Sequence, residues 1–194
     1  MHYRINDNLS EVTPELFARL LSEVSEQRRE KVMAYKHESG RVQSLMAYVT
    51  LKDLLHEQYG FLGNPMLIIG EHDKPSLSHS NLQISISHCS QGVAAAVDER
   101  PVGIDIERIQ SSVKDDLCRY VLNEREYASV HTNDKPEVEF TRLWTMKEAL
   151  LKLKGTGLVA SAELKDILLN TEQYNFKTII NEDRGWVMSV CSIK

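Results

Sequence analysis

Cysteine is scarce in this chain, and several other features are missing with it. Cys89, Cys118 and Cys191 are the three cysteines, and they lie far apart without a Cys-x-x-Cys pair. The sequence therefore predicts reduced thiols and neither a zinc site nor a disulfide framework. The first residues form no apolar segment of the kind that directs secretion, and nowhere do about eighteen apolar residues run together. A cytoplasmic protein without a membrane span is expected.

An excess of positive charge is missing as well. Lys and Arg number 23 against 28 Asp and Glu, so the net charge is −5. Proteins that bind nucleic acid along its phosphates need a basic surface, so nucleic acid is not an expected partner. What remains is an ordinary globular composition, with 42% hydrophobic and 26% charged residues in 194. This length is enough for one good core or for two small fused lobes.

Hydrophobic periodicity predicts helices and strands in a repeating order. Helices are expected over residues 13–25, 41–59, 113–130 and 140–158, and strands over 66–69, 82–88, 93–97, 102–107, 167–169, 176–180 and 186–193. Residues 93–97 are apolar throughout, which predicts a central strand. The order predicts an α+β fold of two α+β lobes, residues 1–101 and 102–194.

The segment 140–158 predicts an amphipathic helix that ends at glycines. Apolar side chains recur at three- and four-residue spacing, at Phe140, Leu143, Met146, Leu150 and Leu153. Gly155 and Gly157 supply the left-handed positions that end a helix. Trp144, Glu148 and Lys152 follow one another by one turn and share another edge. A solvated Glu-Lys pair beside a half-buried Trp explains this edge most simply, and an acid and a base placed for chemistry is the alternative.

A second acidic motif lies upstream, in the alternating segment 102–107. The alternation predicts a strand with Ile104 and Ile106 on one face and with Asp105 and Glu107 on the other. The Cα atoms of the two acidic residues would lie about 7 Å apart. Two like charges on one face repel each other unless they face water or hold a cation. Together with Glu148 they would offer three carboxylates, a ligand set suited to Mg²⁺ or Mn²⁺. A solvated acidic edge is the alternative.

Positive charge is concentrated between residues 28 and 41 of this acidic chain. Arg28, Lys31 and Arg41 belong to this basic segment. They predict either a solvated helix end or a cradle for a phosphorylated ligand. His88, taken alone, is more typical of a structural histidine.

Four blocks in order carry a resemblance to a known family. They are Lys74-Pro75, Ile86-Ser87-His88, the G-I-D-I-E strand of residues 103–107, and the W-x-x-K-E-A-x-x-K helix of residues 144–152, closed by Gly155-Thr156-Gly157-Leu158. In combination they resemble the 4′-phosphopantetheinyl transferases of the surfactin-synthetase-activating type, over about residues 28–158.

The resemblance implies an activity, a cofactor and a partner. Such enzymes move the phosphopantetheine arm of coenzyme A onto a serine of an apo acyl, peptidyl or aryl carrier protein, and Mg²⁺ is required, with Mn²⁺ as a substitute. The resemblance also implies two similar lobes with coenzyme A in the cleft between them, and a monomer is expected because such a chain completes its cleft alone. A metal-dependent nuclease and a non-catalytic coenzyme A-binding module are the alternative functions.

The same resemblance implies roles for the acidic residues and for the helix lysines. Asp105, Glu107 and Glu148 would hold the metal against the pyrophosphate. Glu148 would take the serine proton, directly or through water, and Glu107 is the other candidate base. Lys152 would neutralise phosphate oxygens. Lys147 falls in the apolar arc of its helix, so it is expected to be a structural counter-charge to the acidic cluster.

The remaining implied roles concern coenzyme A. Arg28, Lys31 and Arg41 would bind its 3′-phosphate end, with Ser87 and His88 donating nearby. Lys74 and Pro75 would line the adenine side of the pocket.

Overall fold

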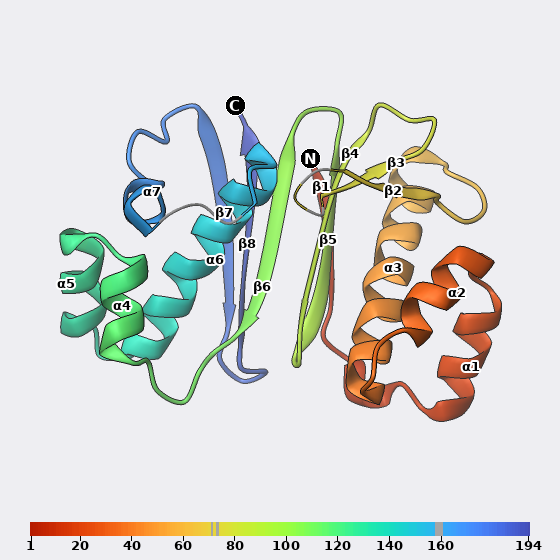
Figure 1. Ribbon diagram of the computed structural model, residues 1–194, viewed down its shortest axis with the longest axis horizontal. Helices are drawn as coiled ribbons and strands as arrows, with labels where there is room; N and C mark the ends of the chain where they lie inside the picture. Colours follow the sequence, from red (N-terminus) through yellow and green to blue (C-terminus); the bar gives the residue numbers. More distant parts are fainter. Residues whose placement is uncertain (71, 73, 158–160) are drawn as a thin grey trace.

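Two antiparallel three-stranded sheets form the centre of the molecule (Figure 1). The structure is a computed structural model that describes residues 1–70, 72, 74–157 and 161–194. The strand order of the first sheet is β1 (His2–Asn6), β5 (Gly92–Asp98) and β4 (Gln83–Cys89). The order of the second is β6 (Val102–Arg108), β8 (Trp186–Ile193) and β7 (Tyr174–Asn181). A separate hairpin consists of β2 (Leu67–Ile69) and β3 (Pro75–Leu77).

Helices cover both outer sides of the paired sheets (Figure 1). Beside the first sheet lie the 3₁₀ turn η1 (Leu9–Glu11) and the helices α1 (Pro14–Ser22), α2 (Glu26–Met33) and α3 (Glu38–Tyr59). Beside the second lie α4 (Asp115–Val121), α5 (Glu124–Thr132), α6 (Pro136–Lys154) and α7 (Ser161–Asp166). None of the helices in the described part of the chain is both long and apolar enough to cross a membrane.

Strand β5 explains how the layers are held together. All of its residues are buried, because one face packs against α3 and the other against the second sheet. Ala95 packs with Leu51 and Leu55 of α3, whereas Ala94 and Ala96 pack with apolar side chains of β6 and β8. The apolar run thus reports two covered faces, and the prediction of a central strand is confirmed.

Strand β6 lies between β4 and α6, where a hydrogen bond to β4 and a close backbone approach to α6 fix its position. The Ile104 amide donates to Ser85 Oγ of β4 at 3.0 Å. On the other side Gly103 meets the backbone of α6, where a Cβ atom would lie 1.9 Å from the Ala149 carbonyl oxygen and 2.5 Å from the Leu153 amide nitrogen. Only glycine allows this approach. The residues that follow on the same face of β6 therefore point at α6.

The predicted elements are largely present in the structure. Segment 41–59 lies within α3, and segments 93–97, 102–107, 176–180 and 186–193 lie within strands; of segment 82–88, all but Leu82 lies within β4. Helix α6 ends at Lys154, and Gly155 takes the expected left-handed conformation, with φ 71°. Leu158, the last residue of the predicted helix, lies outside the described residues.

Two predictions about local structure are wrong, and one strand was not predicted. Segment 113–130 forms two helices, because Asn123 and Glu126 build a capping box that starts α5. Residues 167–169 form a turn and a bend after α7. Strand β1 was not predicted, since it is a partly exposed strand at the edge of its sheet and lacks the marked alternation of the others. The overall α+β class is confirmed.

Candidate active site

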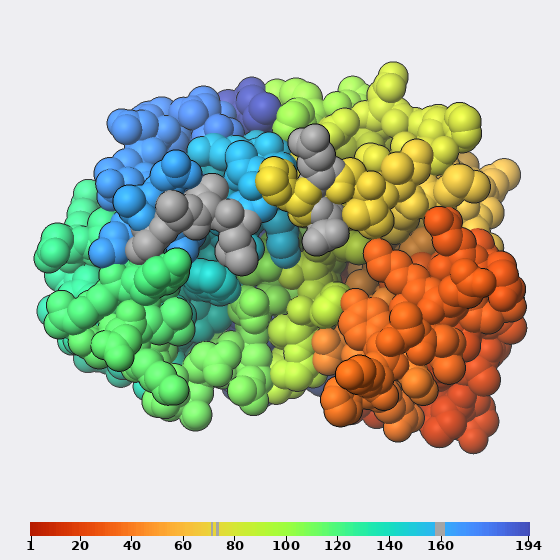
Figure 2. Space-filling view, viewed as in Figure 1, coloured from red at the N-terminus to blue at the C-terminus, as the bar shows by residue number. Residues whose placement is uncertain are grey.

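A cavity of about 790 Å³ is lined by both sheets, by α2, α3 and α6, and by the β2–β3 hairpin. In Figure 2 this side of the molecule is hollowed between the orange helices of the N-terminal half and the green and blue elements of the C-terminal half. The predicted site residues that line it are Arg28, Lys31, Lys74, Pro75, Ser87, His88, Asp105, Glu107, Glu148 and Lys152. Sequence positions from 28 to 152 are thus brought to one cavity.

The acidic residues come from the facing sides of β6 and α6. Ile104 and Ile106 are packed between the sheets, so Asp105 and Glu107 face the opposite way, as the alternation predicts. Asp105 is buried, with 3% of its surface exposed. Its Oδ1 accepts a hydrogen bond from Ser87 Oγ at 2.7 Å. The same oxygen forms an ion pair with Lys152 Nζ at 2.7 Å.

Asp105, Glu107 and Glu148 form an acidic cluster, and two of its carboxylate oxygens lack a hydrogen-bond partner among the described residues. Asp105 Oδ2 and Glu148 Oε1 are buried and have no hydrogen-bond partner among the described residues. A buried carboxylate oxygen without a donor is costly, which marks a place for a cation or a donor. Within residues 1–70, 72, 74–157 and 161–194, however, no three His, Cys, Asp or Glu side chains are arranged as a group that could hold a metal ion.

Burial and the nearby charge of Asp105 raise the pKa values of Glu107 and Glu148. The pKa of Glu107 rises to about 7, first because the side chain is removed from water and then because Asp105 lies close by. Trp144 hydrogen-bonds the Glu107 carboxylate and opposes part of this shift. Burial and Asp105 also raise the pKa of Glu148. A bound cation would relieve the repulsion that these shifts report.

The other end of the cavity is basic. Arg28 is 7% exposed; its guanidinium donates to the Ser44 carbonyl oxygen and, at 3.0 Å, to Ser44 Oγ. It lies 4.8 Å from the ring centroid of Tyr48. Arg28 Nε is buried and has no partner among the described residues. Burial lowers the pKa of His88, and the charges of Lys152 and Arg28 lower it further. These groups together favour an anion.

The cavity thus has an acidic cluster, formed by Asp105, Glu107 and Glu148, and a basic wall, formed by Arg28 and Lys31. Comparison with known proteins agrees with this arrangement. A family model described as the 4′-phosphopantetheinyl transferase superfamily matches residues 101–192, a range that includes β6 and α6. Just under half of the chain therefore matches the 4′-phosphopantetheinyl transferase superfamily, and the relatives described below are named as such transferases. The resemblance drawn from the sequence is thereby confirmed, and the chain is an enzyme of the 4′-phosphopantetheinyl transferase type.

Curated relatives carry the same name. The 4′-phosphopantetheinyl transferase ffp of Bacillus subtilis is 26% identical over 191 residues, which are 91% of this chain and 85% of the relative. The 4′-phosphopantetheinyl transferase Sfp of Bacillus subtilis (strain 168) is 28% identical over 144 residues, 72% of this chain and 64% of Sfp. The 4′-phosphopantetheinyl transferase AcpT of Salmonella typhi is 34% identical over 99 residues, 47% of this chain and 50% of AcpT.

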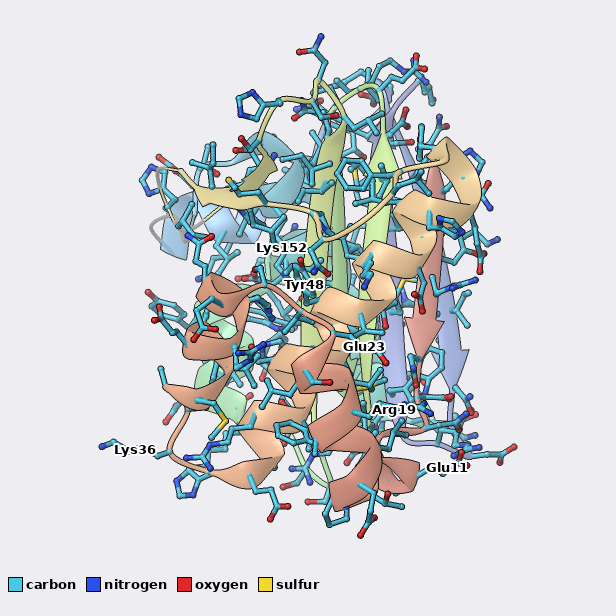
Figure 3. All side chains as sticks on the ribbon, turned by 90° about the vertical axis from the view of Figure 1, so that its right-hand side faces the viewer. Glu11, Arg19, Glu23, Lys36, Tyr48 and Lys152 are labelled. Atoms are coloured by element: carbon cyan, nitrogen blue, oxygen red, sulfur yellow. The ribbon has the colours of Figure 1, made fainter. Side chains whose placement is uncertain are left out.

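Two predicted ligand-binding residues of this transferase are engaged elsewhere. Lys74 lines the cavity, but its ammonium donates to the Leu153 carbonyl oxygen at the end of α6, at 3.0 Å. Burial lowers its pKa. Arg41 is not among the cavity-lining residues, and its Nε donates to the Tyr35 carbonyl oxygen at 2.8 Å. In Figure 3, Lys152 lies near the middle of the view, whereas Lys36 of the basic segment projects outward.

Lys147 does not serve as the predicted counter-charge to the acidic cluster of the transferase. Its ammonium forms an ion pair with Glu126 of α5, at 2.8 Å. The expectation is therefore corrected: the side chain is buried as predicted, but it points toward α5 and α7. Helical periodicity placed the residue in the apolar arc without showing which acid it would meet.

Several residues that shape the site were not identified as such from the sequence. Tyr35 and His72 line the cavity, and nothing in their sequence surroundings indicates this. Ser85 alternates with Ser87 along β4, a period-2 signal that places both on the side of β6. Gly103 directly precedes the acidic pair, and glycine within a strand is a known sign of close backbone approach.

Proposed function

We propose that the protein transfers the 4′-phosphopantetheine group of coenzyme A to a serine hydroxyl of an apo acyl, peptidyl or aryl carrier protein, and releases adenosine 3′,5′-bisphosphate. The observation that carries this proposal is one cavity with a basic wall at Arg28 and Lys31 and an acidic cluster at Asp105, Glu107 and Glu148. Coenzyme A has a terminal phosphate, which the basic wall would bind, and a pyrophosphate, which a metal ion held by the acidic cluster would bind. The named relatives support the same transfer.

Mg²⁺, with Mn²⁺ as a substitute, is the proposed cofactor. Asp105, Glu107 and Glu148 would hold it, because carboxylate oxygens are its preferred ligands and two of these oxygens are buried without a partner among the described residues. When bound, the ion would withdraw charge from the pyrophosphate and stabilise the leaving group. The donor chemistry of the site fits the ion, whereas the present placement of the three side chains does not enclose it.

Proton transfer is assigned to the acids of α6 and β6. Glu148 is the proposed base for the serine hydroxyl, directly or through water, because its raised pKa brings a carboxylate closer to the operating pH. Glu107, whose pKa is raised to about 7, is the other candidate.

Coenzyme A is proposed to lie along the cavity between two lobes, residues 1–101 and 102–194. Arg28, Lys31 and His88 would bind its 3′-phosphate, and Ser87 would donate nearby. Lys74 and Pro75 would border the adenine, with Lys74 contributing mainly by its position because its ammonium is already engaged. Arg41 would also bind the 3′-phosphate, but only after its side chain releases the Tyr35 carbonyl oxygen. The enzyme is proposed to act as a cytoplasmic monomer.

Replacing Lys152 by Met should slow turnover far more than it weakens coenzyme A binding. Lys152 Nζ lies 2.7 Å from Asp105 Oδ1, where it can neutralise phosphate oxygens as charge develops. We expect kcat to fall about 100-fold, with the KM for coenzyme A changed less than about threefold. Steady-state kinetics measure both.

Lys154→Met is the matched control, because Lys154 is exposed on the same helix and the same charge is removed. It should behave as the parent protein does. If Lys152→Met instead lowered kcat little and raised the KM strongly, Lys152 would act in ground-state binding alone.

The function itself is tested with a panel of purified apo carrier proteins, coenzyme A and Mg²⁺. We expect at least one carrier to gain the mass of phosphopantetheine, and the gain to disappear with chelator or when its acceptor serine is replaced by alanine. Absence of a gain on fatty-acid, polyketide and peptide-synthetase carriers would overturn the proposal. The alternatives, a metal-dependent nuclease and a non-catalytic binding module, find no support in the names of the relatives.

A further inference from the structure

Lys147 is buried completely, with 0% of its surface exposed, although it immediately precedes Glu148 on α6. All three donors of its ammonium are used. Its Nζ lies 2.8 Å from Glu126 Oε2 and donates to the carbonyl oxygens of Leu164 at 2.7 Å and Lys165 at 2.9 Å. The two carbonyls belong to the last turn of α7, where backbone acceptors lack helical donors.

The partners of Lys147 are themselves fixed by hydrogen bonds. Glu126 Oε2 accepts the Asn123 amide at 3.1 Å, and Asn123 Oδ1 accepts the Glu126 amide at 3.0 Å. Asn123 Nδ2 donates to the Lys165 carbonyl oxygen at 3.1 Å. The ammonium thus connects α6 to the start of α5 and to the end of α7 in one closed network.

Another side of α6 packs against the second sheet. Thr145 Oγ1 and Ser189 Oγ of β8 lie 2.8 Å apart, and the Ala149 carbonyl lies against Gly103 of β6. Glu148 Oε1 has no hydrogen-bond partner among the described residues. No hydrogen bond holds this oxygen, so its position depends on the rotation and height of the helix.

A buried ion pair is a poor source of stability but a strict constraint on geometry. Removing two charges from water is costly, and apolar side chains of similar size often serve stability equally well. An apolar contact tolerates a small rotation or slide of the helix. A three-fold hydrogen-bonded ammonium does not, because a shift of about 1 Å leaves a buried donor or acceptor unpaired.

We propose that Lys147 is a positioning residue that fixes the rotation and axial height of α6, so that Glu148 faces Asp105 across the cavity. It acts through the helix and touches neither coenzyme A nor the acidic cluster. The kinetic part of this inference rests on the proposed function; the metal-binding part does not need turnover.

The test compares the parent protein with the double variant Glu126→Gln/Lys147→Met. This variant keeps the net charge, and the amide oxygen that replaces the Glu126 carboxylate can still accept the Asn123 amide, so no lone charge is buried. We expect a folded protein whose kcat is about tenfold to 100-fold lower, with a KM for coenzyme A within about threefold. Calorimetric titration with Mn²⁺ alone should show weaker affinity. Lys154→Met, on the exposed side of α6, should change none of these quantities.

Each outcome decides the matter. Unchanged kcat and unchanged Mn²⁺ affinity in a folded double variant would overturn the inference, because Lys147 would then be packing alone. If the double variant fails to fold, the single variant Lys147→Met replaces it, because Glu126 keeps the hydrogen bond from the Asn123 amide; a folded protein with parental Mn²⁺ affinity would again overturn the inference. If the parent protein transfers nothing to any carrier, the proposed function fails, while the Mn²⁺ comparison still decides the role of Lys147.

Discussion

Replacing Asp105 by Asn should lower the rate of phosphopantetheine transfer about 1,000-fold and leave the protein folded. Asp105 lies between β4 and α6, where its Oδ1 accepts from Ser87 and pairs with Lys152, while Oδ2 is left without a partner among the described residues. Asparagine keeps the shape but loses the charge that would hold the metal. Transfer to an apo carrier, followed by mass spectrometry under saturating coenzyme A, measures the loss.

The fold should tolerate this change because the acids repel one another. Asp105 raises the pKa of Glu107 and of Glu148, so its removal relieves a like-charge contact and offsets the lost pair with Lys152. We expect the free energy of unfolding to change by less than about 1 kcal/mol. Asp98→Asn is the control, since Asp98 is a buried aspartate outside the cavity. Full turnover in Asp105→Asn, or unfolding of that variant alone, would contradict a catalytic role for Asp105.

Replacing Gly103 by Ala should damage both the fold and the site. The added methyl group would lie 1.9 Å from the Ala149 carbonyl oxygen and 2.5 Å from the Leu153 amide nitrogen. Both are backbone atoms of α6, so no side-chain rotation can relieve the clash, and the helix and β6 must separate. We expect a loss of about 3 kcal/mol in the free energy of unfolding, measured by urea denaturation.

Turnover should fall even under conditions where the Gly103→Ala protein stays folded. Asp105 follows Gly103 on the same face of β6, and Lys152 precedes Leu153 on α6, so a wider spacing pulls the 2.7 Å Asp105 to Lys152 pair apart. Gly70→Ala is the matched control, because a Cβ there meets only the Lys74 carbonyl oxygen at 3.4 Å. Parental stability in Gly103→Ala would show that β6 and α6 do not pack as described.

Much of the site could be predicted from local pattern alone. The alternation of residues 102–107 placed Asp105 and Glu107 opposite Ile104 and Ile106, and the structure has this arrangement. The one-turn spacing of Trp144, Glu148 and Lys152 put them on one edge, which lines the cavity. Both inferences depend on periods that the backbone imposes within a single element.

What failed depends on contacts between elements. Helical periodicity buried Lys147 correctly, but only the packing of α5 and α7 on α6 shows that its partner is Glu126. Composition placed Arg41 in a basic segment, and only the structure shows that its Nε donates to the Tyr35 carbonyl oxygen; its role in binding coenzyme A stays a prediction. The single helix expected over residues 113–130 broke at Asn123, because its capping box competes with the continuing helix.

The acidic cluster is the centre of this account, and a crystal structure with coenzyme A and Mn²⁺ tests it most directly. The anomalous signal of Mn²⁺ locates the ion independently of any assumption about its ligands. We expect one Mn²⁺ bonded to carboxylate oxygens from both β6 and α6, Asp105 and Glu107 on one side and Glu148 on the other, and to the pyrophosphate at about 2.1 Å. An ion bound elsewhere, or a pyrophosphate that lies away from these three residues, would contradict the account.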